Sequence, residues 1–293
     1  MLRAALALAF SLLASVAHSD PARRVVSINP SLTAILIALG AGDSLVGVDD
    51  FSARQQAQVA GLPLVGGLFS PSLEAVVALE PDLVVLVPSV EQRDFRERLA
   101  ALGFRVEVFD NIRFEQVLEN IERLGRLVGR DEAAAVRVAE IRRARRVVGE
   151  LAAKRTGTGP RPRTLLVMQR DPVFVVGSGS FLDDMLRVVG AENLGASFGD
   201  PYPRVAVEWV LAAAPEVLLD MSPDADAPEA HWSRWSSLPA VKAGRVLRLD
   251  QVVTLPGPDL DRSLVLLATA LHGRELGREI AAALDEPLPV PAP

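Results

Sequence analysis

Residues that commonly carry out chemistry are few in this chain. The sequence contains no cysteine and only three histidines, His18, His231 and His272. The lack of cysteine excludes disulfides, thiol nucleophiles and cysteine metal sites, and isolated histidines argue against zinc and manganese sites. A phosphate-binding GK[ST] motif is missing, and no Ser-His-Asp arrangement is recognisable. We therefore expect a protein that is not an enzyme and that has neither a metal site nor a cofactor.

The net charge and the first residues of the chain narrow the possible partners and the cellular location of the protein. The chain carries a net charge of −6 at pH 7, which argues against a nucleic-acid partner because such a partner requires a basic face. Arg3 is followed by an apolar run at 4–17 and by small residues at Ala17 and Ser19, a pattern that signal peptidase recognises. The run is shorter than the ~20 apolar residues that span a bilayer, which disfavours an uncleaved anchor. We expect residues 1–19 to be a cleavable signal peptide.

The elements that must position any site occur twice. Residues 72–86 read SLEAVVALEPDLVVL and residues 206–220 read AVEWVLAAAPEVLLD, and each has a Glu seven residues before a Pro. The pattern predicts a short helix that ends at its proline and leads into a buried strand of a parallel sheet. Each half is therefore expected to form a β-α-β-α-β lobe. The other elements of the two copies are predicted at 23–28, 31–48 and 104–110 and at 163–168, 180–196 and 244–250.

A helical stretch separates the two halves. Residues 114–154 contain no strand candidate and break at Gly129, which predicts a helix of about 15 residues and a longer one over 132–154. The longer helix would reach about 35 Å, enough to join two lobes. Its spacing predicts a packed face at Val136, Ala139, Arg143 and Val147. The expected division is an N-terminal lobe at 20–130, a connecting helix at 131–155, a C-terminal lobe at 156–284 and a flexible proline-rich tail at 285–293.

The order of these motifs resembles the substrate-binding proteins of ATP-driven (ABC) importers for vitamin B12, ferric siderophores and haem, and the likeness is closest to the members for B12. The matching text includes RVVSINPSLTAILIALGAGDSLVGV at 24–48, PVFVVGSGSFLDDMLRVVGAENLG at 172–195 and both helix-Pro-strand units. The resemblance implies a periplasmic monomer with two Rossmann-like α/β lobes joined by one long helix. It implies a small-molecule ligand in the cleft between the lobes and docking on the permease dimer in the inner membrane. One glutamate of each lobe, Glu74 and Glu208, would then meet the permease.

Ligand contacts are expected in the loops that follow the strands, because sites in α/β sheets lie at the carboxyl ends of the strands. Tyr202 is the only tyrosine and lies between prolines, which favours a pocket position, whereas Phe51 and Phe69 fit a pocket or the core equally. The resemblance places Phe51 and Tyr202 where B12-binding members set aromatic rings against the corrin. The predicted contacts are Asn29, Asp50, Phe51, Leu68, Phe69, Arg170, Phe174 and Tyr202.

The class of ligand stays open between a corrinoid and other bulky chelates. The chain is only 5% aromatic, and the tryptophans that B12-binding members have in the cleft are replaced by Leu68 and Val87. Haem requires an axial ligand, for which Tyr202 and His231 are the candidates. Arg170 could pair with a carboxylate of an anionic ligand, whereas Arg93 and Arg234 fit a solvated surface better. We expect delivery of a corrinoid or similar chelate to an importer, with haem or siderophore binding, or scavenging without a permease, as alternatives.

Overall fold

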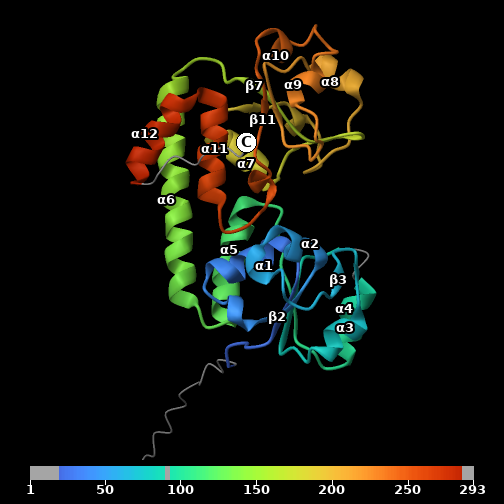
Figure 1. Cartoon of the computed structure of the whole chain (residues 1–293). Helices are drawn as coiled ribbons and strands as arrows, with labels where there is room; N and C mark the ends of the chain where they lie inside the picture. Colours follow the sequence, from blue (N-terminus) through green and yellow to red (C-terminus); the bar gives the residue numbers. More distant parts are fainter. Residues whose placement is uncertain (1–19, 90–92, 286–293) are drawn as a thin grey trace, which may run out of the picture.

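The computed structural model describes residues 20–89 and 93–285 of the chain. These residues form two lobes, and the long helix α6 (Asp131–Thr156) runs along one side of both (Figure 1). The predicted signal peptide lies outside the described residues, as does the predicted tail beyond Asp285. Within the described part of the chain, no helix combines the length and the apolar character that a membrane crossing requires.

The N-terminal lobe is built on a parallel sheet of strand order β2-β1-β5-β6. Strands β1 and β5 are buried along their whole length, which explains their uninterrupted apolar sequences. The strands are β1 (Val25–Ile28), β2 (Leu45–Val48), β5 (Leu83–Leu86) and β6 (Val106–Val108). The helices are α1 (Pro30–Ala38), α2 (Asp50–Gln55), α3 (Leu73–Ala78) and α4 (Arg93–Ala101), and a small hairpin joins β3 (Gly66–Gly67) to β4 (Ser70–Pro71).

The C-terminal lobe repeats this plan. Its parallel strands follow the order β9-β7-β10-β11, and β8 adds an antiparallel partner to β7 that the sequence did not predict. The strands are β7 (Arg163–Arg170), β8 (Val173–Val175), β9 (Glu192–Asn193), β10 (Val217–Asp220) and β11 (Val246–Arg248). The helices are α7 (Phe181–Val188), α8 (Val207–Ala213), α9 (Pro228–Trp232) and α10 (Pro239–Lys242). The predicted fold of two parallel α/β lobes joined by one long helix is confirmed.

The helix-Pro-strand units are alike in backbone conformation as well as in sequence. The residue before each proline, Glu80 or Ala214, has a positive φ, of 45° and 46° respectively. A residue before proline avoids the right-handed helical region, so each chain leaves its helix at this point and enters the sheet. The two prolines, Pro81 and Pro215, are buried.

Helix α6 packs through a different face from the one that the sequence predicted. Its buried residues are Ala134, Val138, Ile141, Ala144, Val148 and Ala152. Of the predicted positions, Val136 is 54% exposed and Ala139 and Arg143 are exposed too, whereas Val147 is half-buried against the core, so the predicted face as a whole was wrong. Alanine and valine occur on more than one face of this helix, so the sequence alone does not show which face is buried. The face that is buried contains three alanines, whose small side chains let the neighbouring helices pack closely. Those neighbours are α5 (Phe114–Leu127), α11 (Leu260–His272) and α12 (Arg274–Leu284).

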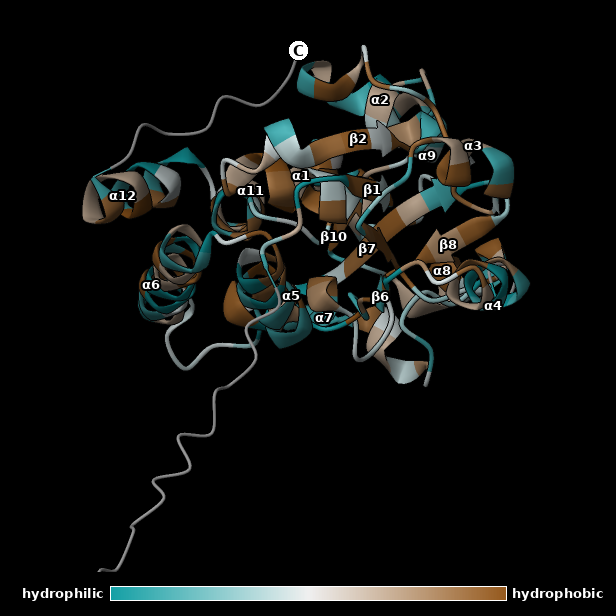
Figure 2. Cartoon of the chain, turned by 90° about the horizontal axis from the view of Figure 1, so that it is seen from below, coloured by the Kyte–Doolittle hydropathy of each residue, from teal (hydrophilic) through white to brown (hydrophobic). Residues whose placement is uncertain are grey.

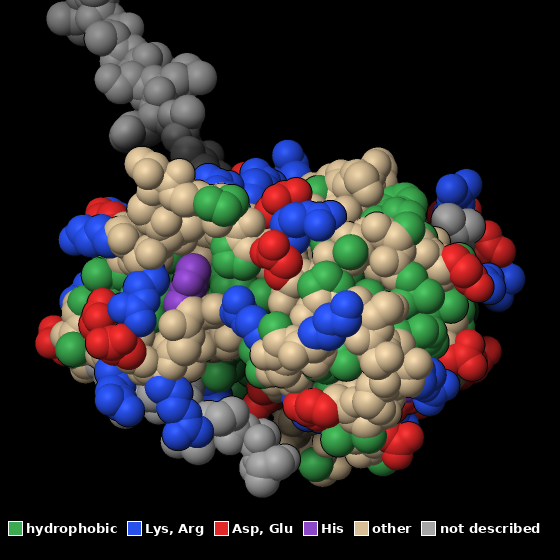
Figure 3. All heavy atoms as spheres, turned by 90° about the horizontal axis from the view of Figure 1, so that it is seen from above, with side chains coloured by type: hydrophobic (Ala, Val, Ile, Leu, Met, Phe, Trp, Pro, Cys, Tyr) green, Lys and Arg blue, Asp and Glu red, His purple; other side chains and the backbone are tan. Residues whose placement is uncertain are grey.

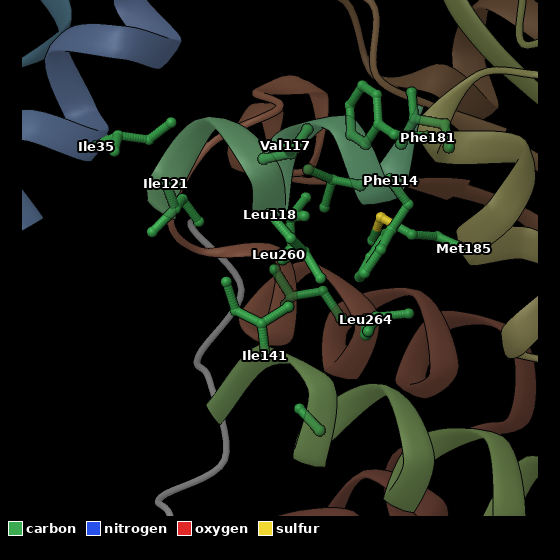
Figure 4. Packing of buried hydrophobic residues seen from close by; sticks show 14 of the residues in the cluster. Ile35, Phe114, Val117, Leu118, Ile121, Ile141, Phe181, Met185, Leu260 and Leu264 are labelled. Atoms are coloured by element: carbon green, nitrogen blue, oxygen red, sulfur yellow. The ribbon is translucent and has the colours of Figure 1, made fainter. Parts of the chain in front are cut away.

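One buried cluster continues from the N-terminal lobe into the C-terminal lobe. Figure 4 shows Phe114 of α5 close to Phe181 and Met185 of α7, with Leu264 of α11 beside them. The backbone N–H of Phe181 also donates a hydrogen bond of 2.6 Å to the carbonyl oxygen of Ile112. The lobes are thus held by side-chain packing as well as by α6, and any large hinge motion would expose this cluster.

Candidate ligand-binding cleft

The carboxyl ends of β1 and β2 present the predicted contacts of the N-terminal lobe. Asn29 follows β1 and is buried, because its side chain caps α1 by accepting a backbone N–H of the first turn at 2.9 Å. Asp49 follows β2 and caps α2 in the same way, accepting two backbone N–H groups at 2.9 and 3.0 Å. This cap leaves the side chain of Phe51 at the surface, 41% exposed, with the guanidinium of Arg54 at 4.7 Å from its ring centroid.

A hairpin lies beside α2 and carries two more predicted contacts. Leu68 and Phe69 form the turn between β3 and β4, and Phe69 is 64% exposed. A Cβ atom on Gly67 would lie 4.0 Å from Oδ2 of Asp50, so the hairpin packs against the first turn of α2. Phe51 and Phe69 thus expose two aromatic rings on neighbouring elements of this lobe. The structure therefore places α2, with Asp50 and Phe51, beside the hairpin that carries Leu68 and Phe69.

In the C-terminal lobe, the predicted contacts gather at the β7–β8 hairpin. Phe174 lies on β8, opposite Gln169 of β7. The segment around Tyr202 runs along the other edge of β8. Pro203 accepts a hydrogen bond of 3.1 Å from the backbone N–H of Val175, and Pro201 accepts one of 2.8 Å from that of Gly177, just beyond the strand. Tyr202 is half-buried, and burial raises the pKa of its phenol. Among the described residues, the hydroxyl of Tyr202 has no hydrogen-bond partner.

Arg170 is also at the end of β7, but its side chain points into the lobe. Its Nε donates a hydrogen bond of 3.0 Å to Oδ2 of Asp220, and both side chains are almost fully buried. The same oxygen accepts the indole N–H of Trp232 at 2.7 Å. Arg170 also donates to the carbonyl oxygen of Asp226 and so holds the loop 221–227, which follows β10. A ligand could reach this guanidinium only after the ion pair opened.

His231 lies beside this ion pair. Its ring centroid is 5.1 Å from that of Trp232 and 5.7 Å from that of Trp235. Burial lowers the pKa of the imidazole, and the positive charges of Arg170 and Arg234 lower it further. The neutral form, which can coordinate iron, is therefore favoured at neutral pH.

The other polar candidates have local roles. Arg93 is exposed in the first turn of α4, and Arg234 is exposed with its guanidinium 5.2 Å from the ring centroid of Trp235. His272 ends α11, and its Nε2 lies 2.7 Å from the carbonyl oxygen of Val189. In residues 20–89 and 93–285, no three His, Asp or Glu side chains gather where they could share a metal ion.

A groove of about 550 Å³ separates the lobes where α1 and α2 face the connection from β11 to α11. Its polar wall includes Gln56, whose Nε2 donates to the carbonyl oxygen of Pro30 at 2.9 Å, while its buried Oε1 finds no hydrogen-bond partner among the residues that the structure describes. Sequence reasoning missed these amides, although the run QQAQ at 55–58 was a visible signal. The lining residues are Pro30, Ala34, Ile37, Ala38, Gln55, Gln56, Gln58, Val252, Thr254, Leu255, Pro258 and Asp259.

The sequence contains one string, GASFG at 195–199, that has the form of a hydrolase nucleophile elbow. In the structure it begins on the short turn η3 (Leu194–Ser197), directly after β9, but the next helix, α8, begins only at Val207, so it does not form a sharp strand-to-helix turn. The hydroxyl of Ser197 donates to the carbonyl oxygen of Leu194 at 3.1 Å. This string therefore does not build a hydrolase site.

Glu74 and Glu208 hold equivalent places in the two lobes. Each is the second residue of its short helix, α3 or α8, and each is exposed. Both helices lie on the side of the molecule that is turned away from α6 (Figures 1 and 2). In the described structure neither carboxylate forms an ion pair, although Ser72 donates to Glu74 at 3.3 Å. Both charges are therefore free to meet a partner.

Comparison with known proteins decides the family. Residues 25–253 match the sequence profile of the family described as periplasmic binding protein. The chain belongs to the periplasmic binding protein family. This binding protein is 29% identical to a vitamin B12-binding protein of Vibrio parahaemolyticus over 233 residues, which cover 79% of this chain and 82% of that protein.

Solved structures agree on the architecture. A periplasmic heme binding protein of Pseudomonas aeruginosa is 28% identical, with a TM-score of 0.73 over 86% of this chain and 93% of the other. The periplasmic vitamin B12 binding protein of Vibrio cholerae has a TM-score of 0.74 at 23% identity, over 88% of this chain and 99% of the other, and shares the fold. These relatives are binding proteins and not enzymes, and their ligands are not cofactors.

Proposed function

We propose that this binding protein holds a corrinoid or a similar bulky chelate between its lobes in the periplasm and delivers it to an ABC importer. The observation that carries the proposal is the paired display of Glu74 and Glu208 on equivalent helices of the two lobes. The helix dipole favours an acid in any first turn, but it does not require one at the same place in both lobes. A two-fold partner such as a permease dimer would use such a pair.

The charge distribution supports docking by individual side chains. Figure 3 shows basic and acidic side chains interspersed over the face of the C-terminal lobe. A partner that docks on such a face must match separate charges, because no broad field of one sign attracts it. Two isolated carboxylates on two lobes fit arginines of the partner, since a guanidinium binds a carboxylate with two parallel hydrogen bonds.

Charge reversal at both positions tests this docking. We expect Glu74→Lys/Glu208→Lys to weaken binding to the reconstituted permease about thirtyfold, because two attractive contacts become repulsive. Affinity for the ligand should stay unchanged, since neither carboxylate belongs to the cleft. The matched control is Glu119→Lys/Glu150→Lys, which reverses two exposed carboxylates on α5 and α6. Unchanged docking and uptake in the first variant would favour a scavenger that meets no permease.

The exposed rings support an apolar, flat ligand. Stacking on Phe51 and Phe69 would bury rings that are now partly exposed to water, at a gain of about 1 kcal/mol or more each. We expect Phe51→Ala and Phe69→Ala each to weaken ligand binding about tenfold, measured by tryptophan fluorescence titration with cobalamin, haem and a ferric siderophore. Leu102→Ala, an exposed apolar residue between α4 and β6, is the control. If none of the three compounds binds below ~10 μM, the assigned ligand class is wrong.

Haem is the second candidate, and two observations favour it. The hydroxyl of Tyr202 has no partner among the described residues, and burial together with the charges of Arg170 and Arg234 lowers the pKa of the His231 imidazole. Either group could serve as an axial ligand to iron. An absorption titration separates the candidates, because axial ligation shifts the haem Soret band. Haem that binds without such a shift would exclude both residues as ligands.

A further inference from the structure

The two helices that display Glu74 and Glu208 are short, and most of their side chains are only half-buried or exposed. Helix α3 has six residues and α8 has seven, lengths at which an isolated helix is unstable. Each has a single fully buried residue, Val76 in α3 and Val210 in α8. These two valines occupy equivalent positions of the repeat. Half-buried side chains such as Val77 and Trp209 also pack against the core, and contacts at the helix ends help to fix the direction of each helix.

The same arginine contact closes the C-terminal end of both helices. Arg24 donates hydrogen bonds of 2.5 and 3.0 Å to the carbonyl oxygens of Leu79 and Glu80. Arg163 donates bonds of 2.7 and 3.5 Å to those of Ala213 and Ala214, the equivalent residues of the second repeat. A positive charge at this end also faces the negative pole of the helix dipole.

The acidic residue after each proline completes the contact. In the first lobe, Asp82 donates its N–H to the carbonyl oxygen of Arg24 at 2.9 Å and accepts the N–H of Arg24 at 3.0 Å. In the second lobe, Glu216 and Arg163 exchange the same two bonds, at 2.8 and 3.1 Å. Each lobe thus ties the start of its first strand, the end of its short helix and the start of the next strand together. We call this arrangement the arginine clamp.

We propose that Arg24 and Arg163 are positioning residues for permease docking, an inference that rests on the function proposed above. Each clamp fixes one end of a short helix whose other end carries the docking glutamate. A partner that engages both lobes at once gains affinity only if both carboxylates are already at the right separation. If a clamp is lost, the helix must be ordered during docking, and the cost of that ordering weakens the complex.

The test compares clamp variants of the full chain. We expect Arg24→Gln/Arg163→Gln to weaken binding to the reconstituted permease about tenfold, while ligand affinity stays within twofold of the wild type. Arg24→Lys/Arg163→Lys keeps the charge but loses the planar fork, so an intermediate loss is expected. The control is Arg23→Gln/Arg161→Gln, which alters exposed neighbouring arginines whose side chains make no hydrogen bond in the described structure.

A double-mutant cycle separates positioning from a loss of fold. In a Glu74→Ala/Glu208→Ala background, the clamp variants should cause no further loss of docking, because the groups that they position are gone. An equal loss in both backgrounds, or a parallel fall in ligand affinity, would overturn the positioning role. If Glu74→Ala/Glu208→Ala itself leaves docking unchanged, the proposed function fails first and the clamp proposal fails with it.

Discussion

Asp220→Ala is expected to lower the free energy of unfolding by about 3–5 kcal/mol. The carboxylate of Asp220 is fully buried and accepts hydrogen bonds from Arg170, from the indole of Trp232 and from the backbone N–H of Ser222. Without this carboxylate, the guanidinium of Arg170 keeps its charge in a low-dielectric interior, because its side chain is only 2% exposed. The carboxylate that is left near it is that of Asp224, at 3.7 Å. Denaturant unfolding followed by circular dichroism measures the loss.

Asp224→Ala is the matched control for this variant. The side chain of Asp224 is 50% exposed and lies farther from Arg170, so its removal should cost less than about 1 kcal/mol. Replacing both partners, as in Asp220→Ala/Arg170→Met, should recover much of the lost stability, because no unpaired charge stays buried. A loss below 1 kcal/mol in Asp220→Ala would mean that Arg170 finds another partner or water.

The repeat made the fold predictable. Apolar strands such as 83–86 and 217–220 follow a proline-terminated helix in both halves, and that local signal is strong enough to specify a covered parallel sheet. Strand β8 was missed because it has only three residues and because its pairing with β7 and with the segment 203–205 is not encoded by any periodicity. The packed face of α6 was wrong because several alanine and valine stripes compete, and only tertiary packing chooses between them.

The sequence predicted on which loops and strand ends the candidate contacts lie, but it did not predict the direction of their side chains. Phe51 and Phe69 were expected in the pocket or the core equally, and the structure finds both exposed because an Asp49 cap and a two-residue turn hold them outward. Arg170 was predicted as a ligand contact because it is an arginine at the end of a strand. The direction of its side chain, however, depends on Asp220, fifty residues later in the chain. Such long-range pairs decide which polar groups a ligand can reach.

Gly177→Ala is expected to displace the Tyr202 segment and to lower the free energy of unfolding by about 3 kcal/mol. A Cβ at this position would lie 1.9 Å from the carbonyl oxygen of Asp200 and 2.6 Å from Cδ of Pro203. Both atoms belong to the backbone or to a rigid ring, so neither can rotate away. The segment must shift as a unit, which breaks the hydrogen bond of 2.8 Å from Gly177 to Pro201.

The shift of the segment should also weaken ligand binding, an effect that a general loss of stability would not cause in the folded protein. Because Tyr202 lies between the displaced residues, ligand affinity should fall about tenfold or more at a temperature where the variant is still folded. The matched control is Gly199→Ala in the same segment, where an added Cβ meets no atom within 4 Å, so stability and affinity should both stay near those of the wild type. Thermal unfolding and fluorescence titration of the two variants measure these effects. If the two variants have equal stability and equal ligand affinity, the segment moves freely and its packing against β8 does not position Tyr202.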